Sequence, residues 1–131
     1  MRILLVAMPN GLIGWDRLTK IPNLGLSSIA GSVERRHLVK ILDLNVAGRN
    51  SIGTFEKVLK EYEPDLVGFS CMSFQYHTAV ELARKTKEYR LDIHTVIGGY
   101  HPTIAPEEIL HSPDMKVIDF VIRGEGEVAF S

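Results

Sequence analysis

The sequence is built from short apolar runs that alternate with segments of helical spacing. Apolar residues recur every three or four positions between the runs, and Pro106 opens a further short helical segment. Near-continuous apolar runs are typical of strands covered on both faces, as in parallel sheets flanked by helices. The pattern therefore predicts strands at residues 3–8, 38–44, 65–70, 93–97 and 120–122, and helices at 24–36, 55–62, 75–89 and 106–110.

This alternation predicts an α/β fold, a flavodoxin-like (Rossmann-like) three-layer sandwich. We expect a five-stranded parallel sheet in the order 2-1-3-4-5, whose switch point lies between strands one and three. The loops that follow Met8 and Ser70 would then lie side by side. Open sheets of this kind bind ligands outside the carboxyl ends of their strands, so we expect any site along that edge.

Composition indicates one ordinary globular domain over residues 1–131, with a net charge of -1. No basic excess favours nucleic acid or an anionic membrane, and no apolar run is long enough to span a bilayer. The single cysteine, Cys71, excludes an internal disulfide and a cysteine-built metal site, and it fits a cytoplasmic setting. Residues 126–131 look like a helix that is just beginning, so we expect a piece of a longer protein.

Two strand-to-loop junctions combine glycines with polar residues. One is Gly-Gly-Tyr-His-Pro-Thr at 98–103, and the other is Arg-Gly-Glu-Gly-Glu at 123–127. Gly98 and Gly99 would let a ligand approach the backbone closely, although a tight turn before a short helix explains them too. The acids of the second junction could cap a helix or bond a ligand.

The junction after the third strand carries Ser70 and Ser73, which offer hydroxyl groups to a ligand. Ser73 is equally suited to be a plain helix N-cap. Cys71 and His77 could form a nucleophilic pair, but no third group orients them and Cys71 could simply be buried. The histidines show no paired helical spacing, so we predict no metal site and no catalytic set.

The long loop at residues 8–23 includes Trp15 and could cover the core, wall a ligand or face a partner domain. Nucleotide motifs fit this loop poorly. Only Gly11 and Gly14 stand where a dinucleotide fingerprint needs three glycines, with Asp43 placed for a ribose. The phosphate loop and the acids of a receiver domain are absent from the sequence. A small nucleotide- or flavin-using oxidoreductase stays an alternative.

Several motifs together resemble one family. They are the Gly-Gly-x-His-Pro-Thr segment, Pro-Glu-Glu at 106–108, and Asp-Phe-Val-Ile-Arg-Gly-Glu-Gly-Glu at 119–127. The opening residues 1–6 and the Pro-Asp-Leu-Val-Gly-Phe-Ser strand at 64–70 match too. The chain is similar, over nearly its whole length, to the N-terminal cobalamin (vitamin B12)-binding domain of radical S-adenosylmethionine enzymes. That family includes anaerobic magnesium-protoporphyrin IX monomethyl ester cyclases and cobalamin-dependent methyltransferases.

The resemblance implies that cobalamin, with its cobalt, lies against the carboxyl edge of the sheet. It implies Ser70 and Ser73 near the nucleotide tail, Gly98 and Gly99 beneath the corrin or the tail, and residues 124–127 at the rim. The full set of cofactor-binding residues expected on this basis is Asn10, Gly11, Ser70, Ser73, Gly98, Gly99, His101, Gly124, Glu125 and Gly126.

Two departures qualify what the resemblance implies. Mutases and methionine synthase ligate cobalt through the histidine of an Asp-x-His-x-x-Gly loop, and Pro-Asn-Gly-Leu-Ile-Gly at 9–14 has no histidine. Cobalt would therefore be held without a protein histidine, or this copy is a scaffold that has lost cobalamin. The full-length family carries an iron-sulfur cluster and S-adenosylmethionine in a catalytic barrel of the same polypeptide. With one cysteine, the chain alone is expected to be non-catalytic.

Overall fold

The computed structural model describes residues 1–9, 24–33, 35–45 and 50–124. Within these ranges, five parallel strands form one sheet in the order β2-β1-β3-β4-β5, as predicted. The fold class inferred from the apolar runs is confirmed. The strands are β1 (Arg2–Ala7), β2 (Leu38–Asp43), β3 (Leu66–Ser70), β4 (His94–Gly98) and β5 (Phe120–Val121).

The helices follow the predicted alternation but differ at their ends. They are α1 (Leu24–Val33), α2 (Ser51–Tyr62), α3 (Tyr76–Tyr89), α4 (Tyr100–Ile104) and α5 (Pro106–Leu110), with short 3-10 turns η1 (Ser73–Gln75) and η2 (Pro113–Lys116). The first helix ends at Val33, three residues earlier than predicted, and the amides of Arg36 and His37 both bond the carbonyl of Val33. The second begins four residues earlier than predicted, at Ser51.

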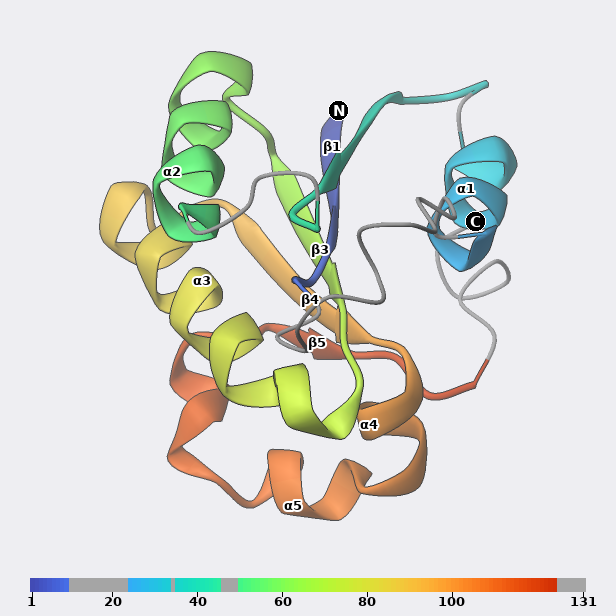
Figure 1. Cartoon of the computed structure of the whole chain (residues 1–131), viewed down its shortest axis with the longest axis vertical. Coiled ribbons are helices and arrows are strands. Elements are labelled where there is room, and N and C mark those ends of the chain that lie inside the picture. The colour runs from blue at the N-terminus through green and yellow to red at the C-terminus, as the bar shows by residue number, and fades with distance from the viewer. Residues whose placement is uncertain (10–23, 34, 46–49, 125–131) are drawn as a thin grey trace.

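Helices cover both faces of the sheet, with α2 and α3 on one face and α1 on the other (Figure 1). The larger core lies under α2 and α3, where the ring of Phe55 packs 5.8 Å from that of Phe69. The smaller core joins Ile3, Leu5 and Ala7 to α1. Side chains of β1 alternate between the two cores, as its continuous apolar run requires.

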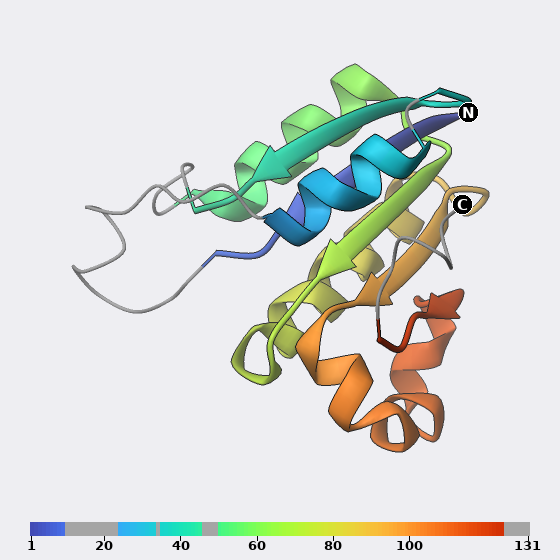
Figure 2. The same cartoon turned by 90° about the vertical axis from the view of Figure 1, so that its right-hand side faces the viewer.

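The carboxyl ends of the central strands lie together, beside the start of α4 (Figure 2). Strand register places Ala7, Ser70 and Gly98 in one row across β1, β3 and β4. Residues paired in register on neighbouring strands point to the same face, which is here the α1 face. The row at this edge is therefore made of small residues only.

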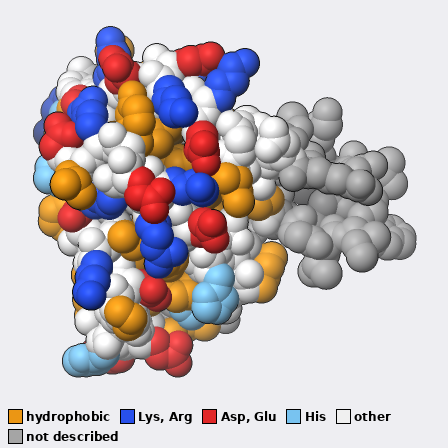
Figure 3. Space-filling view, turned by 90° about the vertical axis from the view of Figure 1, so that its left-hand side faces the viewer, with side chains coloured by type: hydrophobic (Ala, Val, Ile, Leu, Met, Phe, Trp, Pro, Cys, Tyr) orange, Lys and Arg blue, Asp and Glu red, His pale blue; other side chains and the backbone are white. Residues whose placement is uncertain are grey.

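The outer surface of α2 and α3 carries charges of both signs, interspersed over the face (Figure 3). An ion pair of 3.2 Å joins Lys85 of α3 to Glu56 of α2. Among the residues described, no helix is long and apolar enough to cross a membrane.

Candidate functional site

The carboxyl edge of the sheet leaves backbone and small side chains open on the α1 face. Ser70 and Gly98 are partly exposed there, whereas Ala7 beside them is buried. A Cβ built on Gly98 would meet only the Cβ of Ile122, at 3.7 Å. Within the described ranges, no residue makes a hydrogen bond to the Ser70 hydroxyl. This part of the edge has the room and the free hydroxyl that a polar ligand lying against the sheet would use.

Gly99 is a glycine for a different reason from Gly98. Its φ is +101°, and a Cβ there would lie 2.9 Å from both the amide nitrogen and the carbonyl oxygen of Cys71. Two hydrogen bonds hold the backbones together at this point, from Cys71 N to Gly98 O (3.0 Å) and from His101 N to Cys71 O (3.2 Å). The tight-turn interpretation therefore accounts for Gly99, whose direct contact with a ligand stays a prediction.

His101 is nearly buried, with 9% of its surface exposed. Its Nδ1 hydrogen-bonds the Ser73 hydroxyl at 3.0 Å, and its ring lies 4.6 Å from that of Tyr76. The Tyr76 hydroxyl in turn donates to Asp114 (2.7 Å). Burial, followed by this bond to the carboxylate, raises the pKa of Tyr76 to about 12, so Tyr76 stays a neutral donor. The Ser73 hydroxyl thus bonds a histidine. The N-cap interpretation of Ser73 is wrong, because the N-cap positions of η1 and α3 are occupied by Met72 and Gln75.

Thr103 of α4 joins the two glycine-containing junctions that the sequence singled out. Its hydroxyl donates to the carbonyl of Gly99 (2.8 Å) and accepts the amide N–H of Gly124 (3.0 Å). The Arg123 guanidinium also donates to the Thr103 carbonyl, at 3.3 Å. Gly124, at φ +76°, would have open space around a Cβ. The loops after β4 and β5 are therefore bonded to each other.

Exposed apolar side chains flank this edge. Met72 and Phe74, in the connection from β3 to α3, are 47% and 56% exposed, and Ile104 at the end of α4 is 55% exposed. Exposed apolar side chains beside a candidate site favour contact with an apolar ligand surface or another domain.

The nucleophile hypothesis for Cys71 is wrong. The thiol is 2% exposed, and burial raises its pKa to about 12. A thiol with so high a pKa stays protonated, and only the thiolate attacks efficiently. Within the described residues, no three histidine, cysteine or acidic side chains are grouped to hold a metal ion. The Asp43 carboxylate, considered for a ribose, accepts the amide N–H of Asn45 at 2.9 Å.

Four predicted site residues, Asn10, Gly11, Glu125 and Gly126, lie outside the described residues. The structure brings the other predicted residues to one edge, through Ser70 and Ser73 after β3, Gly98 to His101 after β4, and Gly124 after β5. Thr103, Tyr76 and Asp114 also take part in this edge and were not predicted from the sequence. Thr103 is four residues after Gly99, the spacing of a threonine that bonds back to a helical carbonyl, but no helix was predicted at 100–104.

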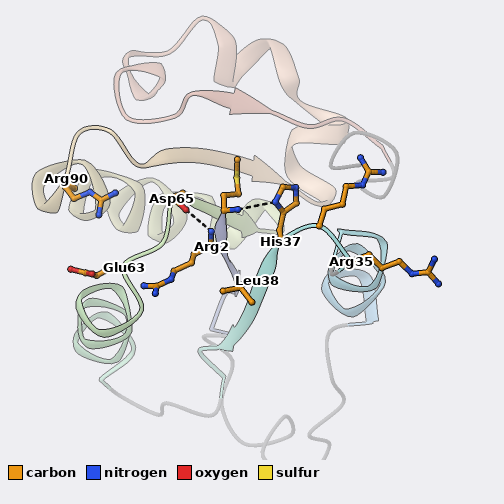
Figure 4. Close-up of a pocket in the computed structure, with 9 residues that line it drawn as sticks. Arg2, Arg35, His37, Leu38, Glu63, Asp65 and Arg90 are labelled. Carbon is orange, nitrogen blue, oxygen red and sulfur yellow. Dashed lines mark hydrogen bonds between the residues drawn. The ribbon is translucent and has the colours of Figure 1, made fainter.

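A hollow of about 570 Å³ lies at the opposite, amino edge of the sheet (Figure 4). Charges of both signs line it, and several already have partners. Arg2 donates from its backbone N–H to Asp65 (2.7 Å) and from its guanidinium to the Tyr62 carbonyl (3.1 Å), while Arg90 pairs with Asp92 (2.8 Å). Arg35 points away from the centre of the hollow. Because parallel sheets bind ligands at their carboxyl ends, we favour the opposite edge as the functional site.

The fold and the carboxyl-edge site define a ligand-binding domain of the open α/β class. Residues 13–131 match the B12 binding domain family, and the chain belongs to this family. The resemblance inferred from the sequence motifs is thereby confirmed.

Two curated relatives extend the match along the chain. An uncharacterized methyltransferase of Pyrococcus horikoshii is 34% identical over 99% of this chain, and an anaerobic magnesium-protoporphyrin IX monomethyl ester cyclase of Synechocystis sp. is 32% identical over 97%. The chain spans only 28% and 26% of the lengths of these proteins.

Two solved structures share the fold. The radical S-adenosylmethionine methyltransferase TsrM of Kitasatospora setae superposes with a TM-score of 0.70 at 17% identity, covering 97% of this chain and 24% of TsrM. The cobalamin-dependent S-adenosylmethionine radical enzyme OxsB, solved with aqua-cobalamin and S-adenosylmethionine, gives a TM-score of 0.70 at 22% identity, covering 96% of this chain and 17% of OxsB.

Proposed function

We propose that the chain binds cobalamin at the carboxyl edge of its sheet. The observation that carries the proposal is the open row at the ends of β3 and β4, where the Ser70 hydroxyl has no hydrogen bond among the described residues and Gly98 has no side chain. Membership of the B12 binding domain family supports cobalamin over other ligands of this fold. Small residues in register let a broad, flat ligand or its tail lie directly on the sheet.

Each part of the edge has a role in this proposal. Ser70 donates or accepts a hydrogen bond with the polar tail of the cofactor, and Gly98 allows the approach. Apolar contact beside the sheet edge comes from Met72, Phe74 and Ile104. In this proposal cobalt is held without a protein histidine, because the 9–14 segment, where the related mutases carry that ligand, contains none. When bound, cobalamin would carry a methyl group or assist radical chemistry.

We further propose that the chain is one module of a larger radical S-adenosylmethionine enzyme. The chain spans about a quarter of the length of its two relatives named above, which supports a further domain in the same polypeptide. That domain, a catalytic barrel, would hold the iron-sulfur cluster and S-adenosylmethionine, since a single cysteine cannot ligate such a cluster. The whole enzyme would perform methyl transfer or an oxidative cyclisation, and this module alone would not be catalytic.

The test is direct. Purified protein is mixed with hydroxocobalamin, desalted and examined by visible absorption, with flavin mononucleotide and NAD in parallel. We expect one equivalent of cobalamin to be retained and to show a base-off spectrum. Retention of flavin or NAD instead would favour the oxidoreductase alternative. Retention of none would favour a scaffold domain that has lost cobalamin.

A further inference from the structure

We propose that Thr103 and His101 are positioning residues, which fasten the loops after β3, β4 and β5 into one rigid rim. The inference rests on the proposed cobalamin site and assigns these residues a role in presenting it. Both belong to the Gly-Gly-Tyr-His-Pro-Thr motif, yet the Thr103 hydroxyl and the Nδ1 of His101 bond protein groups. The rim is defined here as residues 70–75, 98–104 and 122–124.

His101 fastens the loop after β3 at two points. Its backbone N–H bonds Cys71 O at 3.2 Å, and its ring nitrogen bonds the Ser73 hydroxyl at 3.0 Å. The ring of Tyr76 covers the imidazole at 4.6 Å, and Asp114 holds Tyr76 in place. A nearly buried imidazole with these contacts orients Ser73 and leaves its Nδ1 unavailable to a ligand.

Thr103 fastens the loop after β5. Its hydroxyl uses both of its roles, as donor to Gly99 O and as acceptor from Gly124 N. This bond crosses 21 residues of sequence and joins α4 to the end of β5, whose strand is only two residues long. A Cβ built on Gly124, at φ +76°, would meet no atom within 4 Å outside its chain neighbours, so packing at this position does not replace the bond.

A rim fixed in advance lowers the cost of binding, because the loops need not be ordered when the ligand arrives. We therefore predict that loosening the rim affects cobalamin binding more than it affects stability. Loss of the Thr103 hydroxyl weakens cobalamin binding more than an equally destabilising change elsewhere in the sheet.

Thr95 provides the matched control. Its hydroxyl also uses both of its roles, since it donates to Val117 O and accepts the backbone N–H of Asp119 (3.2 Å). Thr95 lies at the amino half of β4, away from the rim, and is fully buried. Thr103→Val in α4, which follows β4, and Thr95→Val near the start of β4 therefore remove the same kind of bond on either side of the carboxyl end of β4.

The experiment measures amide hydrogen exchange and hydroxocobalamin affinity in the wild type, Thr103→Val, Thr103→Ser and Thr95→Val. We expect Thr103→Val to speed exchange at Gly124 and to weaken cobalamin binding about tenfold, the loss of roughly one to two hydrogen bonds. Thr103→Ser should restore both values to within about threefold of wild type. Thr95→Val should lower the melting temperature but leave Gly124 exchange and the affinity at wild-type values.

A second pair tests His101. His101→Phe keeps a ring against Tyr76 but loses the bond to Ser73, and Ser73→Ala removes the partner. We expect each change to speed amide exchange across 72–75, and the double variant to add little to either. Additive effects would contradict the proposed link.

The outcomes separate the two proposals. If wild-type protein does not bind cobalamin, the proposed function fails, and exchange at Gly124 alone then decides whether the rim is fastened. If wild type binds, unchanged exchange or unchanged affinity in Thr103→Val would overturn the positioning role. Equal weakening by Thr95→Val would overturn it too, since the effect would then be one of general stability.

Discussion

At the scale of single residues, the two adjacent glycines at the end of β4 have different reasons to be glycine. Gly98 faces open space near Ile122, whereas Gly99 takes a left-handed φ against the backbone of Cys71. The sequence could mark both as special but could not separate them, because the difference lies in which strand each one faces. That information depends on the pairing of β3 with β4.

Alanine at each position should separate folding from binding. Gly99→Ala should cost about 1–3 kcal/mol of stability, because its Cβ would lie 2.9 Å from backbone atoms in a strained conformation. Gly98→Ala should change stability by less than about 0.5 kcal/mol. It should nevertheless weaken cobalamin binding roughly tenfold, through a methyl group on the contact face. Urea unfolding and a cobalamin titration measure both quantities, and a reversed order would contradict the assignment.

Cys71 should be unreactive in the folded protein. Its pKa of about 12 leaves a thiolate fraction on the order of 1 in 10,000 at pH 8. Iodoacetamide should therefore label the native chain far more slowly than the chain in urea, where the thiol pKa returns to about 8.5. Mass spectrometry over time follows the reaction. Equal rates in both states would show that Cys71 is accessible.

At the scale of elements, apolar periodicity predicted the strands and the long helices, but not α4. This helix has five residues and includes Pro102, so neither periodicity nor a recognisable start indicates it. The start of α2 was missed because Ser51 and Gly53 are typical of turns. Short elements of this kind depend on tertiary contacts, such as the bonds from Thr103, more than on local propensity.

The short strand β5 is anchored by Asp119, which precedes it. Its carboxylate accepts from Lys87 Nζ (2.6 Å) and from the Thr95 amide (2.8 Å). Partial burial opposes ionisation, but these bonds outweigh it and lower the pKa of Asp119 below its usual value.

A group with a lowered pKa in the folded state stabilises the protein above its unfolded pKa, near 3.9. The contribution of Asp119 should be complete at neutral pH and disappear as pH falls through the folded value. Asp119→Asn should cost on the order of 1 kcal/mol at pH 7, a figure discounted because the carboxylate is partly exposed to solvent. The difference from wild type should shrink in acid. Urea unfolding between pH 2 and 7 measures it, and a constant difference would contradict the linkage.

At the scale of the whole molecule, topology indicated the candidate site more clearly than any single motif did. The order β2-β1-β3-β4-β5 brings the carboxyl ends of β1, β3 and β4 together, and this could be predicted from the alternation of elements. The bonds that build the rim could not, since Ser73 and His101 are 28 residues apart and Thr103 and Gly124 are 21 apart. Such pairs become visible only when the strands are placed side by side.

The central claim is that cobalamin binds at the carboxyl edge and not in the hollow at the amino edge. The most direct measurement is a nuclear magnetic resonance titration of the labelled chain with hydroxocobalamin, followed through backbone amide shifts. We predict shifts at residues 70–73, 98–101 and 122–124, with the amides of Arg2, His37 and Asp65 unmoved. Shifts confined to the amino edge, or none at all at saturating cobalamin, would contradict the account.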